Sequence, residues 1–183
     1  MIQALQKQRP SNNCNLRTNW EPPPRGWVKL NTDGAVWDSK NMAGCGGLIR
    51  TYDGSWVAGF TAKLGNCQVF QAELWGMRHG LQMAWDLGVR RIIVETDSAE
   101  ALDKLNSMEL TSQSFNSLVR EIHSLKNRPW EILFQHIKRE GNQCANWLAK
   151  NSLRKNYGFN FIDNPHVELQ KLICNDCQGR VTH

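Results

Sequence analysis

Hydrophobic and polar residues alternate with a period of two in the first part of the chain. This alternation covers Trp27–Asp33 and predicts a β-strand that stops at the turn signal Asp33-Gly34. Two further extended stretches cover about 43–52 and 55–64, and Asp53-Gly54 between them predicts a tight hairpin turn. The first part of the chain therefore predicts three strands that form an antiparallel meander.

The period of the pattern then changes from that of a strand to that of a helix. Over 68–87 apolar residues recur every three or four positions, and Gly88 follows, which predicts a long amphipathic helix with a glycine at its end. The apolar, β-branched run 91–97 predicts a buried strand. The remaining elements that we expect are helices over 99–107 and about 115–127, a strand over 130–138 and a final helix after Gly141.

The order of these elements predicts an α/β domain with a mixed sheet. Three antiparallel strands come first, and the last two strands are reached through crossover helices, which is the connection that parallel strands need. We place this domain at residues 27–155. The Pro-rich residues 1–26 are expected to form a disordered leader, and the apolar positions of the tail 156–183 are numerous enough to pack on the domain.

Composition agrees with one globular domain. The chain has 183 residues, of which 40% are hydrophobic, and this excludes a wholly disordered, collagen-like or coiled-coil protein. It has no run of 18 apolar residues, and its first ten residues lack an apolar signal core. We therefore expect an intracellular monomer, nuclear or cytoplasmic, that does not associate with membranes.

The net charge of +5 is a weak indication of a polyanionic partner. Residues 1–26 carry +3 of it, 27–155 carry +3 and 156–183 carry −1. The expected domain is thus only slightly basic. If it binds a polyanion, the arrangement of its charges matters more than their sum.

Three acidic residues stand at positions that structure alone does not require. Asp33 and Asp97 each follow a predicted strand, and the carboxyl ends of parallel neighbours meet at one edge of a sheet. Glu73 lies on the apolar stripe of the long helix, and Asn146 lies on that of the final helix. Each acid also has an ordinary explanation: a turn for Asp33, a helix cap for Asp97 and the solvated border of the stripe for Glu73.

Taken together, the three acids favour a metal site. Carboxylates that lie close together raise one another's pKa values, and a bound cation removes that conflict. A set of oxygen ligands without His or Cys suits Mg²⁺ or Mn²⁺.

Four motifs in this order resemble the ribonuclease H family, and most closely its plant-type branch, which is related to the reverse-transcriptase-associated domains of retroelements. They are Leu30–Ala35 (LNTDGA), Gln71–Gly76 (QAELWG), Glu95–Ser98 (ETDS) and His136–Asn146 (HIKREGNQCAN). The resemblance covers residues 27–155. It implies a ribonuclease H-like fold, with a five-stranded mixed sheet flanked by helices, strands 1–3 antiparallel and strands 4 and 5 parallel.

The resemblance also implies an activity, which is metal-dependent hydrolysis of the RNA strand of RNA–DNA hybrids to 5′-phosphate and 3′-hydroxyl ends. Two Mg²⁺ ions about 4 Å apart, or Mn²⁺ in their place, would clamp the scissile phosphate. Asp33, Glu73 and Asp97 match the first three metal-binding carboxylates of the family, and Asn146 stands at the fourth. His136 matches a loop histidine that assists proton transfer or product departure.

Contacts to the nucleic acid are expected from four further residues. Gly34 would let the backbone approach the sugar and phosphate groups, Ser98 follows the third acid, and Lys138 and Arg139 offer positive charge. For the two basic residues a merely solvated position is the alternative.

Two other functions stay open at this point. Because Asn146 brings no negative charge, the chain could be a catalytically weakened module that binds nucleic acid or a protein partner. It could also be a different nuclease on the same fold, such as an exonuclease or a transposase-like enzyme.

Overall fold

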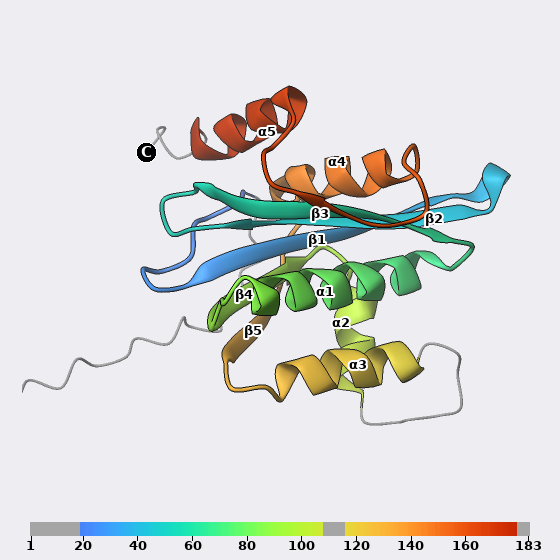
Figure 1. Cartoon of the computed structure of the whole chain (residues 1–183), viewed down its shortest axis with the longest axis horizontal. Helices are drawn as coiled ribbons and strands as arrows, with labels where there is room; N and C mark the ends of the chain where they lie inside the picture. Colours follow the sequence, from blue (N-terminus) through green and yellow to red (C-terminus); the bar gives the residue numbers. More distant parts are fainter. Residues whose placement is uncertain (1–18, 108–115, 179–183) are drawn as a thin grey trace, which may run out of the picture.

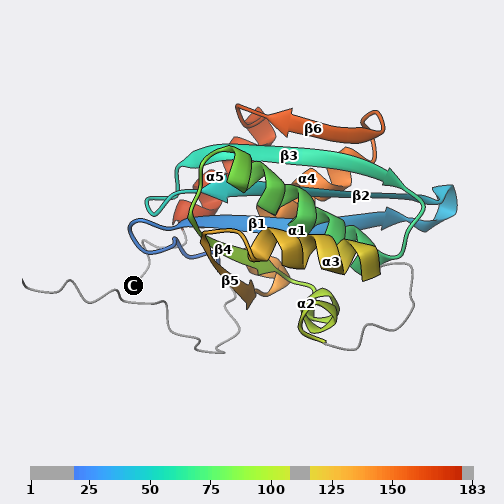
Figure 2. The same ribbon diagram turned by 60° about the horizontal axis from the view of Figure 1, so that its bottom comes forward.

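A six-stranded mixed sheet forms the centre of the protein. The computed structural model describes residues 19–107 and 116–178. The strands lie side by side in the order β5-β4-β1-β2-β3-β6 (Figure 1; β6 is labelled in Figure 2). Their bounds are Val28–Trp37 for β1, Met42–Arg50 for β2, Trp56–Gly65 for β3, Arg91–Thr96 for β4, Glu131–His136 for β5 and Gly158–Ile162 for β6.

Helices cover both faces of this sheet. In Figure 1, α1, α2 and α3 lie on one face, and α4 and α5 lie on the other. Their bounds are Val69–Asp86 for α1, Ala99–Asn106 for α2, Asn116–Lys126 for α3, Gln143–Ser152 for α4 and Val167–Gln178 for α5. Each of the four helices expected from the sequence is present, and the tail adds α5.

Strand directions confirm the mixed sheet. The neighbours β1–β2, β2–β3 and β3–β6 are antiparallel, whereas β1–β4 and β4–β5 are parallel. The expected count of five strands is one too low. The additional strand, β6, comes from the tail and pairs antiparallel with β3 at the edge of the sheet (Figure 2). Its Phe159 stacks on Phe60 of β3, with ring centroids 5.5 Å apart, so apolar contact accompanies the pairing.

The expected end of the first strand at Asp33-Gly34 is wrong. Strand β1 continues to Trp37, and all of Lys29–Trp37 pairs with β2. Asp-Gly favours a turn only when the chain is free to reverse, whereas here the antiparallel partner supplies hydrogen bonds beyond Asp33. What ends near this acid is the pairing with β4, which covers only Val28–Asn31 of β1.

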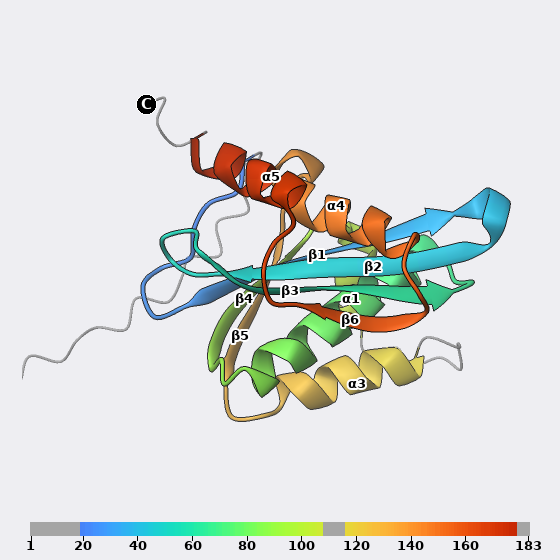
Figure 3. The ribbon, with the colours of Figure 1, turned by 45° about the horizontal axis from the view of Figure 1, so that its top comes forward.

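Two apolar layers form the core, one on each face of the sheet. The larger layer packs α1, α2 and α3 against side chains such as Leu30 and Ile92. The smaller one packs α4 and α5 against Leu48, with Leu169 of α5 fully buried in it. Figure 3 shows α5 alongside α4 above the sheet. The tail is therefore part of the folded unit.

The end of the expected leader also packs on the sheet. Trp20 is only 2% exposed, and its indole N–H donates to the side chain of Asn31 on β1. Residues 1–18 of the leader lie outside the described residues, so their expected disorder stays a prediction. In the part of the chain that the structure describes, no helix combines the length and the apolar character that crossing a membrane requires.

Candidate active site

Asp33, Glu73 and Asp97 come together where β1 and β4 diverge. Asp33 is on β1 just beyond its pairing with β4, Asp97 follows β4 directly, and Glu73 is in the first part of α1. One carboxylate oxygen from each residue lies within 4.8 Å of the others. Asp33 and Glu73 are 5% and 4% exposed, and Asp97 is half-buried. We call these three residues the acidic triad.

A close contact between α1 and β1 brings Glu73 to this position. A Cβ atom added to Gly34 would lie 2.7 Å from the main-chain nitrogen of Glu73 and 2.9 Å from the Cβ of Ala72. Only a residue without a side chain lets the helix lie this close to the strand. The structure thus gives Gly34 a packing role, while the contact with sugar and phosphate expected from the sequence stays a prediction.

Each member of the triad is held by a hydrogen bond. The main-chain N–H of Gly34 donates to Oδ1 of Asp33 at 3.0 Å. The Thr96 hydroxyl donates to Oε2 of Glu73 at 3.3 Å. The side-chain amide of Asn142 lies 3.5 Å from Oδ1 of Asp97, which is the longest contact of the three. These bonds leave other carboxylate oxygens of the triad for a ligand.

The two buried acids of the triad hold protons more tightly than ordinary carboxyl groups. Burial, together with the charge of Asp97, raises the pKa of Asp33 to about 7, although a hydrogen bond with Glu73 opposes this. Burial and the charge of Asp33 raise the pKa of Glu73 to about 10. Asp33 and Glu73 thus share a proton at neutral pH when no cation neutralises them.

A divalent cation fits this donor set. Within the described ranges, no ion pair joins a member of the triad to a basic side chain, so the negative charge there lacks a directly bound cationic group. Three carboxylates are hard oxygen ligands, which Mg²⁺ and Mn²⁺ prefer. A bound cation would replace the shared proton and lower both pKa values.

His136 lies beside the triad. It is the last residue of β5 and pairs in register with Thr96 of β4. Its ring nitrogen Nε2 lies 3.1 Å from the main-chain oxygen of Asp97, and because a carbonyl oxygen only accepts, Nε2 is the donor. The sequence put this histidine where a strand ends, and the structure has it there; its expected part in catalysis stays a prediction.

The other residues singled out in the sequence differ in burial. Asn146 is buried on α4, one turn after Asn142, whose main-chain oxygen accepts its N–H at 3.0 Å. Ser98 caps α2 through a hydrogen bond from the N–H of Ala101. Lys138 and Arg139 are exposed after β5, and the charge of Arg139 acts to lower the pKa of Asp33.

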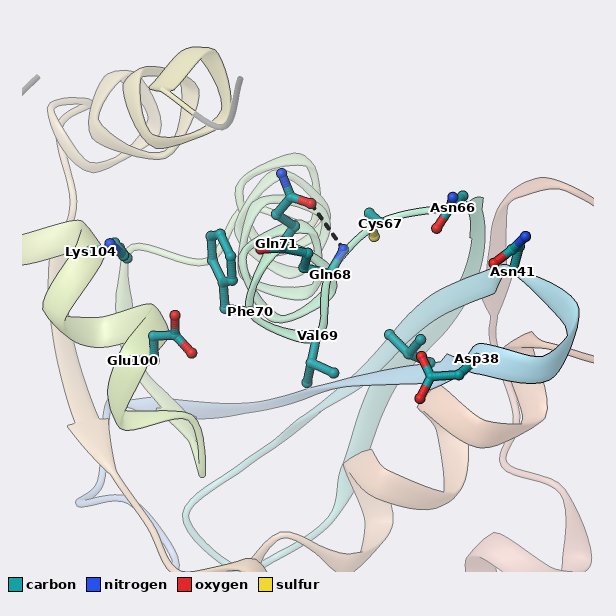
Figure 4. Close-up of a pocket in the computed structure, with 11 residues that line it drawn as sticks. Asp38, Asn41, Asn66, Cys67, Gln68, Val69, Phe70, Gln71, Glu100 and Lys104 are labelled. Carbon is teal, nitrogen blue, oxygen red and sulfur yellow. Dashed lines mark hydrogen bonds between the residues drawn. The ribbon is translucent and has the colours of Figure 1, made fainter. Parts of the chain in front are cut away.

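A cleft of about 980 Å³ opens between the end of β1, the start of α1 and α2. In Figure 4, Val69 and Phe70 at the start of α1 face Glu100 and Lys104 of α2 across it. Amide side chains line much of the remainder: Asn41, Asn66, Gln68 and Gln71. The cleft is thus polar, and it shares β1 and α1 with the triad, although Asp33, Glu73 and Asp97 do not line it.

The sequence does not single out Asn142 as a candidate site residue. Its side-chain amide donates to the main-chain oxygen of Thr32 at 2.9 Å as well as facing Asp97, so it joins β1 to the end of β4. It is 1% exposed. An asparagine just before a helix is typical of an ordinary cap, and only the fold shows that its side chain reaches Asp97.

Comparison with known proteins places this chain in a family. The family model described as reverse transcriptase-like matches residues 31–152, about two thirds of the chain. A protein of Arabidopsis thaliana with the name "Putative ribonuclease H protein" is 35% identical over 160 residues, which are 87% of this chain. They are only 26% of that relative, so the chain spans about a quarter of its length.

Solved structures share the fold. The ribonuclease H1 of the archaeon Halobacterium salinarum covers 70% of this chain with 98% of its own, at 24% identity and a TM-score of 0.64. LC11-RNase H1, solved in complex with an RNA/DNA hybrid, covers 69% with 96% of its own, at 20% identity and a TM-score of 0.63. The chain therefore belongs to the reverse transcriptase-like family and has the ribonuclease H-like fold.

Proposed function

We propose that this protein is a metal-dependent endonuclease that hydrolyses the RNA strand of RNA–DNA hybrids. The observation that carries the proposal is the acidic triad, whose three carboxylates converge where the central strands β1 and β4 of a ribonuclease H-like sheet diverge. The 35% identical relative bears the name of a ribonuclease H, and LC11-RNase H1 was solved with an RNA/DNA hybrid. Both support this substrate class.

Asp33, Glu73 and Asp97 would hold the divalent ions, with the side-chain oxygen of Asn146 as a neutral fourth ligand. The expected ions are two Mg²⁺, for which Mn²⁺ can substitute. When bound, such ions polarise the scissile phosphate, acidify water and stabilise the leaving oxygen, which yields 5′-phosphate and 3′-hydroxyl ends. The chain's own part is to hold the carboxylates in a fixed arrangement, with those of Asp33 and Glu73 buried.

His136 is the proposed proton carrier. Because its Nε2 is bound to the Asp97 carbonyl, Nδ1 is the ring atom left to accept or return a proton. The same hydrogen bond fixes the ring next to the triad, so that the proton does not have to come from bulk solvent. Replacing His136 by alanine should slow turnover and leave metal binding intact.

The polar cleft and the exposed basic side chains are proposed to bind the hybrid. Lys138 and Arg139 would contact phosphates, and main-chain groups around Gly34 and Ser98 would meet the 2′-hydroxyls that distinguish RNA from DNA. Contacts of this kind follow the backbone of the nucleic acid and do not read bases. We therefore expect cleavage with little sequence preference.

Asn146 supports a second candidate function, a weakened module that binds nucleic acid without efficient cleavage. An amide oxygen ligates a hard cation but brings no charge, so the metal would be held less tightly than by four carboxylates.

A cleavage assay with three forms of the protein separates the two candidates. A labelled RNA–DNA hybrid is incubated with wild type, Asn146→Asp and Asp33→Asn in Mg²⁺ and in Mn²⁺. An active enzyme predicts cutting by the wild type, equal or faster cutting by Asn146→Asp, and none by Asp33→Asn. If Asn146→Asp is the only form that cuts the hybrid, the wild type is not an active enzyme and the weakened module is supported instead.

A further inference from the structure

A buried polar layer lies on the sheet face that α4 and α5 cover. It contains Lys29 and Asn31 of β1, Arg50 of β2 and Glu95 of β4, each at most 1% exposed. The Lys29 ammonium lies 2.7 Å from Oε1 of Glu95, and the Asn31 amide donates to Oε2 of Glu95 at 2.9 Å. Polar groups this deeply buried are costly unless each finds a partner.

Two residues that bind this polar layer, Trp20 and Asp176, come from outside the residues that match the family. The indole N–H of Trp20 donates to Oδ1 of Asn31 at 2.9 Å, and the ring lies 3.6 Å from the guanidinium of Arg50. Asp176 of α5 accepts from Arg50 at 2.7 Å and is itself only 12% exposed. The matched segment covers 31–152, so Trp20 precedes it and Asp176 follows it.

Asn31 connects these two residues to the candidate active site. Its Oδ1 also accepts from the second guanidinium nitrogen of Arg50, at 3.2 Å, so one Arg50 side chain bridges Asn31 and Asp176. Its amide nitrogen donates to Oδ1 of Asn142 at 3.3 Å. Asn142 in turn binds the main-chain oxygen of Thr32 and faces Asp97.

The orientation of Asn142 depends on this chain of contacts. An asparagine amide can be turned by half a rotation with little change in shape, and only its partners select which end points where. Asn31 offers its N–H group to Asn142 because its own oxygen is occupied by Trp20 and Arg50. Asn142 must then present its oxygen to Asn31 and its N–H group to Thr32 and Asp97.

We propose that Trp20 and Asp176 are positioning residues for the acidic triad, acting through Asn31 and Asn142. They hold Asn142 in the orientation that fixes the carboxylate of Asp97 and the start of α4, where Asn146 lies. The flanking segments are then needed for the metal site as well as for folding. This inference rests on the proposed function, because it presumes that the triad binds a divalent ion.

The test compares variants of the full chain by titration with Mn²⁺ and by hybrid cleavage. Asn142→Ala removes the last link, Trp20→Phe keeps an aromatic ring but removes the indole donor, and Asp176→Asn removes the charge. Matched controls are Trp85→Phe and Glu168→Gln, which lie outside the network. Isothermal titration gives the Mn²⁺ affinity, and urea unfolding gives the stability of each form.

We expect weaker Mn²⁺ binding in every network variant. Changes to groups that orient metal ligands cost about 10–100-fold in affinity or activity, and we expect this range for Asn142→Ala. Trp20→Phe and Asp176→Asn should each weaken binding about 3–10-fold and lower kcat more than they change KM, since the cleft is unchanged. Adding Trp20→Phe to Asn142→Ala should cause no further loss, because both act on one path.

Other outcomes overturn the inference, and they separate it from the proposed function. If the wild type binds Mn²⁺ and cleaves hybrids while Trp20→Phe and Asp176→Asn bind Mn²⁺ as the controls do, the proposed function stands and the inference fails. The inference also fails if these variants lose stability at unchanged Mn²⁺ affinity. If the wild type binds no divalent ion, both fail together.

Discussion

Burial in the fold shifts the pKa values of individual residues far from their ordinary values. Asp33 and Glu73 are buried next to each other, so that each group resists ionisation. His79, on α1, is enclosed by aromatic rings, and burial lowers its pKa to about 4. Acids and base are thus shifted toward their neutral forms, and the stability of the protein should depend on pH in two different ways.

Asp33→Asn should stabilise the protein above pH 7 in the absence of divalent ions. The pKa of Asp33 rises from 3.8 to about 7 on folding, so the folded state binds more protons, and stability falls as the pH rises through this window. The amide avoids this cost, and we expect a gain of about 1–3 kcal/mol at pH 8 in urea unfolding. Mn²⁺ should then stabilise the wild type and not the variant. A variant less stable than the metal-free wild type would contradict this explanation.

His79→Phe should flatten the pH dependence of stability on the acid side. The centroid of the His79 ring lies 5.4 Å from that of Trp75, on which it stacks, and 5.3 Å from that of Phe159, and we expect a phenyl ring to keep these contacts. The pKa of His79 in the folded state, about 4, lies below the ordinary 6.5. The contribution of the neutral ring to the free energy of unfolding is therefore complete above pH 6.5 and is lost as the pH falls toward 4.

Urea unfolding at pH 7 and pH 4 measures this effect. The wild type should lose about 1–3 kcal/mol more than His79→Phe over that interval. Equal losses in the two proteins would show that His79 is not protonated on unfolding in this range.

Among the elements, local patterns predict most helices and strands but not how far each strand extends. The helical spacing over 68–87 corresponds to α1, and the apolar run 91–97 corresponds to β4. The Asp33-Gly34 turn signal was misleading because a dipeptide does not reveal that β2 continues to pair with β1 beyond it, as far as Trp37. Asn142 was missed because its partners, Asn31 and Thr32, lie about 110 positions earlier in the chain.

Gly34→Ala should separate α1 from β1 and disturb the metal site. The new methyl group would lie within 3 Å of the main chain at Ala72 and Glu73, which a rigid helix relieves only by moving. We expect a loss of about 1–3 kcal/mol in stability together with weaker Mn²⁺ binding, measured by urea unfolding and calorimetry. Ser39→Ala, at an exposed position, is the control. Unchanged Mn²⁺ affinity in Gly34→Ala would show that the contact does not position Glu73.

The complete domain needs segments from both ends of the chain. The sequence placed the domain at 27–155, where the family motifs lie, and left the tail without a role, although its apolar positions were expected to pack on the domain. In the structure the tail supplies β6 and α5, and residues 19–26 bring Trp20 into the buried polar layer. Patterns of single segments do not show such pairing between the two ends, because the charges and amides involved look like surface residues in the sequence.

Shortening the chain after Lys155 should therefore destabilise it strongly. The truncation removes Asp176 and leaves the guanidinium of Arg50, which is 1% exposed, without its carboxylate partner. Loss of one member of a buried ion pair costs about 3–5 kcal/mol, and lost apolar contacts with α5 add to this. Urea unfolding of the full and shortened chains measures the difference. Equal stabilities would support the boundary expected from the sequence.

The proposed activity depends on the acidic triad holding divalent ions for cleavage of the RNA strand in a hybrid. The decisive experiment follows a hybrid labelled on its RNA strand, with the full-length wild type and Asp33→Asn side by side in Mg²⁺ and in EDTA. We expect internal RNA cuts with 5′-phosphate and 3′-hydroxyl ends, only with wild type and Mg²⁺, and an intact DNA strand. Cutting by Asp33→Asn, cutting in EDTA, or no cutting by the wild type in Mg²⁺ or Mn²⁺ would contradict the proposed activity.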